Sequence, residues 1–132
     1  EEIHYKAQTG EYLLRELHPR EILDFGPLCV ECFPVVHAGS IQGAGILDPI
    51  PAFGYRITCD GESVAITGDT GLCDSVRDLV RDADLAILEA TFADTDGIDP
   101  EMFTRVHLSE TIAHDLGALA REYLLVHRAE RH

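Results

Sequence analysis

Four apolar runs in the chain each end on a side chain that can bind a metal ion or transfer a proton. Runs of apolar and β-branched residues predict buried strands. The runs at 30–36, 64–67, 85–88 and 123–126 lead into His37, Asp69 (after Gly68), Glu89 and His127. Ligands bind beyond the carboxyl ends of the strands in open α/β sheets, so parallel neighbours would bring these groups together. Two imidazoles and two carboxylates suit a metal ion; the alternative is that polar residues simply end strands.

The length, composition and charge of the chain limit the class of protein it can be. A chain of 132 residues makes one domain or part of one, and it opens on Glu1 rather than Met, which suggests a fragment. Its 24 acidic and 10 basic residues give a net charge of −14. Such a surface repels phosphate backbones and disfavours unaided nucleic-acid binding. We expect a cytoplasmic protein without a membrane segment, because no apolar run is long enough to span a bilayer and no signal peptide is evident.

The four cysteines include one Cys-x-x-Cys pair, Cys29 and Cys32. A zinc ribbon needs a second such pair, and the sequence has none. Residues three apart in a strand point to opposite faces, so this pair is not expected to share a ligand. We therefore expect small buried thiols in a reducing cytoplasm.

The first half of the chain predicts little regular structure before residue 28. Residues 12–17 fit a short helix ended by Pro19, within an N-terminal connector at 1–27. Residues 28–37 predict a strand that Pro34 restricts to a sheet edge or breaks. The glycines and prolines of 39–51 predict a long loop of the kind that often forms a lid. Its apolar residues can contact a substrate or simply pack against the protein; they are Ile41, Ile46, Leu47 and Ile50.

The second half alternates strands and helices. A hairpin is expected from 53–59 and 63–67, joined by a turn at Asp60-Gly61. Helices are expected at 73–83 and from the N-cap Ser109 to about residue 122, with an acidic solvated loop at 93–104 between them. Strands at 85–88 and 123–126 complete the order. This alternation favours an α/β sandwich in which helices cover a sheet.

Five short segments, in this order and spacing, resemble the metallo-β-lactamase superfamily. They are Phe-Gly-Tyr-Arg-Ile at 53–57, Gly-Asp-Thr at 68–70, Leu-Glu-Ala-Thr-Phe at 88–92, His-Leu-Ser at 107–109 and Leu-Val-His at 125–127. Over residues 28–128 the chain is most similar to the ribonuclease Z and related phosphodiesterase branch. The resemblance implies an αβ/βα sandwich with a two-zinc site along one edge of its sheets.

The resemblance also implies roles for individual residues. His37 matches a ligand of the first zinc, Asp69 the carboxylate that bridges both zincs, and His127 a ligand of the second. His107 resembles the histidine that helps to protonate the leaving group. Glu89 resembles the acid that orients this histidine.

The sequence departs from the family pattern at two points, and these bear on whether the chain contains the complete metal site. Leu88 stands where the family segment around Glu89 often begins with histidine. The defining His-x-His-x-Asp-His cluster, which normally precedes the equivalent of His37, is absent from these 132 residues. Without it each metal would keep only two protein ligands, too few for a stable zinc site. The chain is therefore expected to be an α/β protein holding about one half of the sandwich, with residues 28–132 as the C-terminal half.

The expected function is hydrolysis of a phosphodiester by a metal-bound hydroxide when the N-terminal half is present. A complete site would hold two Zn²⁺ ions, with Mn²⁺ and Fe²⁺ as alternatives, and the substrate would be a phosphodiester or another small hydrolysable compound, with tRNA as one candidate. Two alternatives stay open: a metal-free, non-catalytic fold or assembly module, and a lactone or thioester hydrolase on the same scaffold. Half a sandwich should expose an apolar sheet face, which predicts a homo-oligomer or pairing with the N-terminal half.

Overall fold

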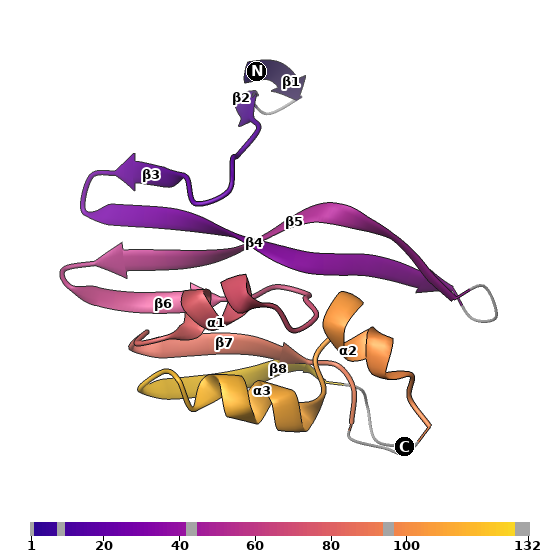
Figure 1. Ribbon diagram of the computed structural model, residues 1–132. Coiled ribbons are helices and arrows are strands. Elements are labelled where there is room, and N and C mark those ends of the chain that lie inside the picture. Colours follow the sequence, from indigo (N-terminus) through magenta and orange to yellow (C-terminus); the bar gives the residue numbers. More distant parts are fainter. Residues whose placement is uncertain (1, 8–9, 42–44, 94–96, 129–132) are drawn as a thin grey trace.

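The computed structural model describes residues 2–7, 10–41, 45–93 and 97–128. A hairpin of β1 and β2 forms a small separate sheet, and six further strands form the main sheet (Figure 1). The strands are β1 Glu2–Ala7, β2 Gly10–Arg15, β3 Ile22–Phe25, β4 Leu28–Ile41, β5 Gly45–Cys59, β6 Glu62–Ile66, β7 Leu85–Ala90 and β8 Glu122–Arg128. The helices are α1 Asp74–Val80, α2 Pro100–Arg105 and α3 Glu110–Gly117.

The main sheet has the order β3-β4-β5-β6-β7-β8. Strands β3 to β6 pair antiparallel, whereas β6, β7 and β8 pair parallel. Strands β4, β6, β7 and β8 consequently all run in the same direction. The condition stated from the sequence, parallel neighbours, is therefore met by β6, β7 and β8, whereas β5 separates β4 from β6.

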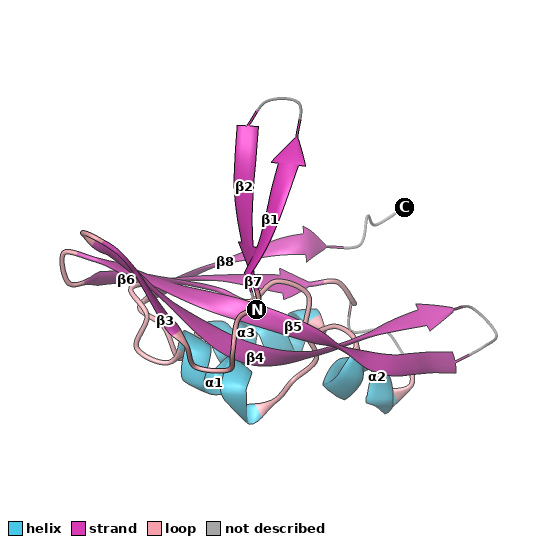
Figure 2. Ribbon diagram, turned by 90° about the horizontal axis from the view of Figure 1, so that it is seen from above, coloured by secondary structure: helices cyan, strands magenta, loops and turns pink. Residues whose placement is uncertain are grey.

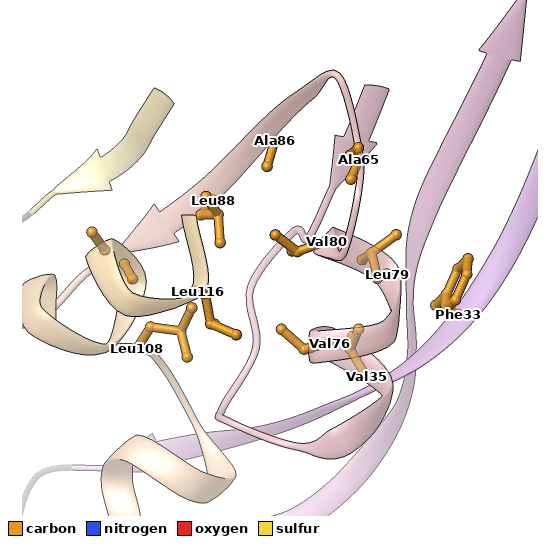
Figure 3. Close-up of a cluster of buried hydrophobic side chains, with 13 residues drawn as sticks. Phe33, Val35, Ala65, Val76, Leu79, Val80, Ala86, Leu88, Leu108 and Leu116 are labelled. Atoms are coloured by element: carbon orange, nitrogen blue, oxygen red, sulfur yellow. The ribbon is translucent and has the colours of Figure 1, made fainter. Parts of the chain in front are cut away.

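All three helices lie on one face of the main sheet (Figure 2). Alternate residues of the strands point towards them, and Ala65, Ala86 and Leu88 are fully buried there. Helix α1 adds Val76 and Leu79 to the same core (Figure 3). The core thus holds β6 and β7 rigidly behind the ends that carry Asp69 and Glu89.

The opposite face of the main sheet is open. One row of side chains crosses it through paired positions, with Tyr55 on β5, Ile66 on β6, Ile87 on β7 and Leu124 on β8. Leu124 is 56% exposed and Val126 is 45% exposed. The apolar sheet face expected of half a sandwich is therefore present.

Strands β4 and β5 form a long twisted hairpin that projects beyond the helices (Figure 1). The loop predicted at 39–51 is wrong for residues 39–41 and 45–51, which belong to paired strands, and its residues 42–44 lie outside the described residues. Strand β6 pairs only with residues 55–59 of β5, so Pro49 and Pro51 lie where β5 has no second partner. A proline lacks a backbone donor, and at such a free edge no sheet hydrogen bond is lost.

Several local predictions are confirmed by the structure. The Asp60-Gly61 turn has positive φ at both residues, as a tight two-residue hairpin requires. The Ser109 side chain caps α3 by accepting a hydrogen bond from the Ile112 backbone. Both predicted helices exist but end earlier than expected, α1 at Val80 and α3 at Gly117.

Two local predictions fail. The helix expected at 12–17 is wrong, since β2 covers Gly10–Arg15 and pairs with β1. The loop expected at 93–104, whose residues 94–96 lie outside the described residues, is wrong from Pro100 onwards, where helix α2 begins with Asp99 as its N-cap. Proline is well tolerated there because the first helical N–H groups have no partner in the helix.

The four cysteines carry free thiols. Cys29 is exposed and Cys32 is buried, as opposite faces of a strand require. The expectation of buried thiols holds only for Cys32, because Cys59 and Cys73 are half-buried. Within the described residues, no helix is long and apolar enough to cross a membrane.

Candidate functional site

The loop after β6 brings Asp69 to the site. Gly68 has a φ of 59°, a conformation that favours glycine, and it turns the chain as the strand ends. The Gly71 N–H then donates to the Val36 carbonyl at 2.7 Å, which fixes this loop against β4. A Cβ at Gly71 would lie 2.4 Å from the Thr104 backbone, so only glycine allows this approach. Asp69 is thereby placed beside the strand that carries His37.

Glu89 is a buried carboxylate whose oxygens are fully used. It is 2% exposed. One oxygen accepts from the Thr70 N–H at 2.9 Å and from His107 Nδ1 at 2.8 Å. The other accepts from the Thr91 N–H at 3.0 Å and the Thr91 hydroxyl at 2.8 Å. Four donors fill the four positions at which a carboxylate accepts, so Glu89 is held as an orienting group rather than a metal ligand.

His107 is oriented by this carboxylate. Its Nδ1–H donates to Glu89, which leaves Nε2 free to face the site. The hydrogen bond to Glu89 raises the pKa of His107, burial opposes that effect, and the negative charges of Glu89 and Asp69 add to it. An imidazole whose charged form is favoured in this way can hold a proton for transfer.

His127 and Asp69 form a second imidazole–carboxylate pair, this one open to solvent. His127 Nδ1 lies 2.8 Å from Asp69 Oδ1, and the side chains are 53% and 44% exposed. The register of β8 against β7 shifts at Glu89/Ala90, and His127 has a φ of 49°. This bulge takes a non-glycine residue into the left-handed region and turns its side chain towards Asp69.

His37 lies next to His107. Its ring centroid is 5.2 Å from that of His107, and the His107 centroid is 5.5 Å from that of His127. His37 Nδ1 lies 2.9 Å from the Val106 carbonyl. A carbonyl can only accept, so Nδ1 carries the proton and Nε2 is free as a ligand atom.

All five residues predicted for the site thus gather at one edge of the molecule. Asp69, His107 and His127 offer ligand atoms that lie within 4.8 Å of one another. His37 adds a free imidazole nitrogen next to this group. One carboxylate and imidazoles with free nitrogens are donors that fit Zn²⁺, but they make up only part of the ligand set of a two-metal centre.

One residue of the site was not singled out from the sequence. The Thr91 hydroxyl donates to Glu89 and lies 3.5 Å from His127 Nδ1, so it touches both imidazole–carboxylate pairs. Its position two residues after Glu89, within the segment Leu-Glu-Ala-Thr-Phe, is the signal that could have identified it.

Comparison with known proteins places the chain in a family. A model described as "Beta-lactamase superfamily domain" matches residues 2–127. The chain belongs to the metallo-β-lactamase superfamily. The expected resemblance to its ribonuclease Z-like branch and the expected fold class, about one half of an αβ/βα sandwich, are confirmed. Most members of this superfamily are hydrolases.

Three relatives illustrate the similarity. An uncharacterized protein of Mycobacterium tuberculosis is 39% identical over 85 residues, which are 62% of this chain and 30% of that protein. A ribonuclease Z of Gemmatimonas aurantiaca is 36% identical over 72 residues, or 54% of this chain and 23% of the enzyme. The metallo-β-lactamase fold protein YhfI of Bacillus subtilis has a TM-score of 0.67 at 24% identity, covering 88% of this chain and 43% of YhfI. The matched part of the chain thus spans a third or less of the length of the mycobacterial protein and of the ribonuclease Z.

Proposed function

We propose that this chain is the C-terminal half of a metal-dependent phosphodiester hydrolase. Residues 28–132 would form the half-domain, and residues 1–27 would connect it to the preceding half, with β3 of this connector pairing at the edge of the main sheet. The observation that carries the proposal is the buried Glu89–His107 pair, 2.8 Å apart, next to the solvent-open Asp69 and His127. A fixed proton donor beside open metal-binding groups is what hydrolysis of an ester with a poor leaving group requires.

In this proposal the residues divide into two sets. His37, Asp69 and His127 would hold the metal ions, with Asp69 serving as a ligand for both. His107 gives a proton to the departing oxygen, and Glu89 holds His107 in the orientation and tautomer that this transfer needs. Bound Zn²⁺, or Mn²⁺ or Fe²⁺ in its place, would act as a Lewis acid on the phosphoryl group and lower the pKa of a bound water.

The substrate is proposed to be a phosphodiester, and the net charge argues for a small one. With 24 acidic and 10 basic residues, the chain repels a polyanion such as tRNA, so binding of tRNA would need basic surface in the other half. We also propose a cytoplasmic location, because free thiols persist in a reducing compartment.

The test uses the full-length protein that contains this chain. Elemental analysis should find two zinc equivalents, and cleavage of bis-p-nitrophenyl phosphate should stop when a chelator removes them. Asp69→Asn should lose both metal and activity, whereas Asp74→Asn, which changes a fully exposed carboxylate on α1, should keep both. Metal near zero and no effect of chelator on melting would instead support a non-catalytic module. Lactone turnover without phosphodiester cleavage would support the other hydrolase class.

The open sheet face is proposed to be covered by the preceding half of the protein or by a second copy of the chain. The exposed row that includes Leu124 and the neighbouring Val126 is too apolar to stay in water at no cost. Light scattering on the 132-residue chain should therefore show self-association, and addition of the other half should replace it with a one-to-one complex. A monomeric chain that binds little apolar dye would contradict this proposal.

A further inference from the structure

An exposed apolar surface adjoins the site on its β5 side. It consists of Leu47 and Ile50, which we call the apolar shelf. Ile50 is the cross-strand partner of His37 in the β4–β5 hairpin. Directly paired residues share a face of a sheet, with their Cβ atoms about 5 Å apart, so the Ile50 side chain lies beside the His37 ring.

Leu47 extends this surface along the same hairpin. Its Cδ1 atom lies 3.1 Å from the point that a Cβ on Gly39 would occupy, so the leucine covers that glycine. Gly39 follows His37 by two residues and shares its face. The Leu47 carbonyl accepts from Arg105 Nη2 at 3.3 Å, which ties this part of the hairpin to α2.

The apolar shelf remains exposed although it is fixed in place. Ile50 is 53% exposed and Leu47 is 42% exposed. His37 adjoins both the shelf, through Ile50, and the proposed proton donor His107, whose ring centroid lies 5.2 Å from that of His37. A phosphodiester bound at the site with its leaving oxygen at His107 would thus have the shelf within reach of its second ester group.

We propose that the apolar shelf binds the retained ester group of the substrate and selects phosphodiesters in which that group is an apolar ring. This inference rests on the proposed function. A ring laid on Leu47 and Ile50 removes apolar surface from water on both partners, whereas a methyl ester or a ribose-phosphate chain gains little there. The net charge of −14 acts in the same direction, because it opposes a long polyanionic substituent.

The test compares two substrates with the same leaving group in the full-length protein. Bis-p-nitrophenyl phosphate retains a ring, whereas methyl p-nitrophenyl phosphate retains a methyl group. Ile50→Ala should lower kcat/KM for the first about tenfold, the usual size for loss of one apolar contact, and leave the second within about twofold. Leu47→Ala should act in the same way. Ile22→Ala, which truncates an isoleucine 64% exposed on β3, should change neither substrate.

Binding without turnover separates this inference from the proposed function. Calorimetry should show that Ile50→Ala weakens binding of diphenyl phosphate about tenfold and leaves dimethyl phosphate unchanged. If the protein cleaves neither substrate but shows this difference in binding, the shelf is supported and the proposed function fails. If cleavage occurs but both substrates respond equally, or the variants change only the oligomeric mass, the shelf proposal is wrong and the proposed function stands. Preferential binding of an RNA oligonucleotide that Ile50→Ala abolishes would also overturn it.

Discussion

The site contains two imidazole–carboxylate pairs with the same separation and opposite environments. In both pairs the Nδ1 atom lies 2.8 Å from a carboxylate oxygen. The His107 and Glu89 side chains are 17% and 2% exposed, whereas those of His127 and Asp69 are 53% and 44% exposed. Distance alone therefore does not distinguish these pairs, but burial does.

The difference suggests what each pair can do. A buried carboxylate with four hydrogen bonds has no capacity for another partner, so the Glu89–His107 pair is fixed. The Asp69–His127 pair is solvated, so exchanging this contact for a metal ion carries little desolvation cost. The Glu89–His107 pair can thus orient the imidazole, whereas Asp69 and His127 can exchange their mutual contact for a metal ion.

The largest expected effect comes from removing the fixed imidazole. In the full-length protein, His107→Ala should lower kcat for an alkyl phosphodiester about 10³-fold, because no group would protonate the departing alkoxide. The loss should be much smaller for a p-nitrophenyl ester, whose leaving group departs without a proton. Steady-state kinetics on both esters measures the difference. His114→Ala serves as the control. It removes an exposed imidazole that is hydrogen-bonded to the Tyr123 hydroxyl, and it should change neither rate. An equal loss on both esters would contradict the role in protonation.

The next effect separates the two carboxylates by stability. Glu89→Gln should lower the free energy of unfolding by about 3 kcal/mol, because an amide nitrogen would face the donors that now meet a buried carboxylate. Asp69→Asn should change it by less than about 0.5 kcal/mol, as expected for an exposed pair. Urea denaturation without metal measures both values. Equal losses would mean that burial does not distinguish the pairs.

The smallest effect tests the residue that touches both pairs. Thr91→Val should cost about 1 kcal/mol of stability, because Glu89 loses one hydroxyl donor while its backbone bonds remain. Thr91→Ser keeps the hydroxyl and should restore most of this loss. If serine and valine behave alike, the hydroxyl is not the source of the effect.

The parts of the site that sequence could predict are those set by local pattern. Strand runs that end at Asp69 and Glu89, together with the parallel order of β6 and β7, are enough to bring these carboxylates to one edge. The side-chain direction of His127 could not be predicted from the local sequence. It depends on a bulge of β8 against β7 and on the positive φ of His127, and no neighbouring residue indicates either feature.

The predictions that failed for 12–17 and 39–51 have one cause, which is pairing with a strand elsewhere in the chain. The pattern at 12–17 fits a helix, but β1 supplies a partner that makes it a strand. The glycines and prolines at 39–51 favour a loop, but β4 pairs with this segment while its other edge stays free. Local propensity is a weak guide wherever a distant partner strand determines the outcome.

The prolines on the free edge of β5 have a consequence for aggregation of the protein. A long hairpin with an unpaired edge is a template on which other chains can add strands and grow into aggregates. Pro49 and Pro51 interrupt the donors along the part of β5 that β6 leaves unpaired. The free edge of the hairpin that supports the apolar shelf is therefore a poor template for an added strand.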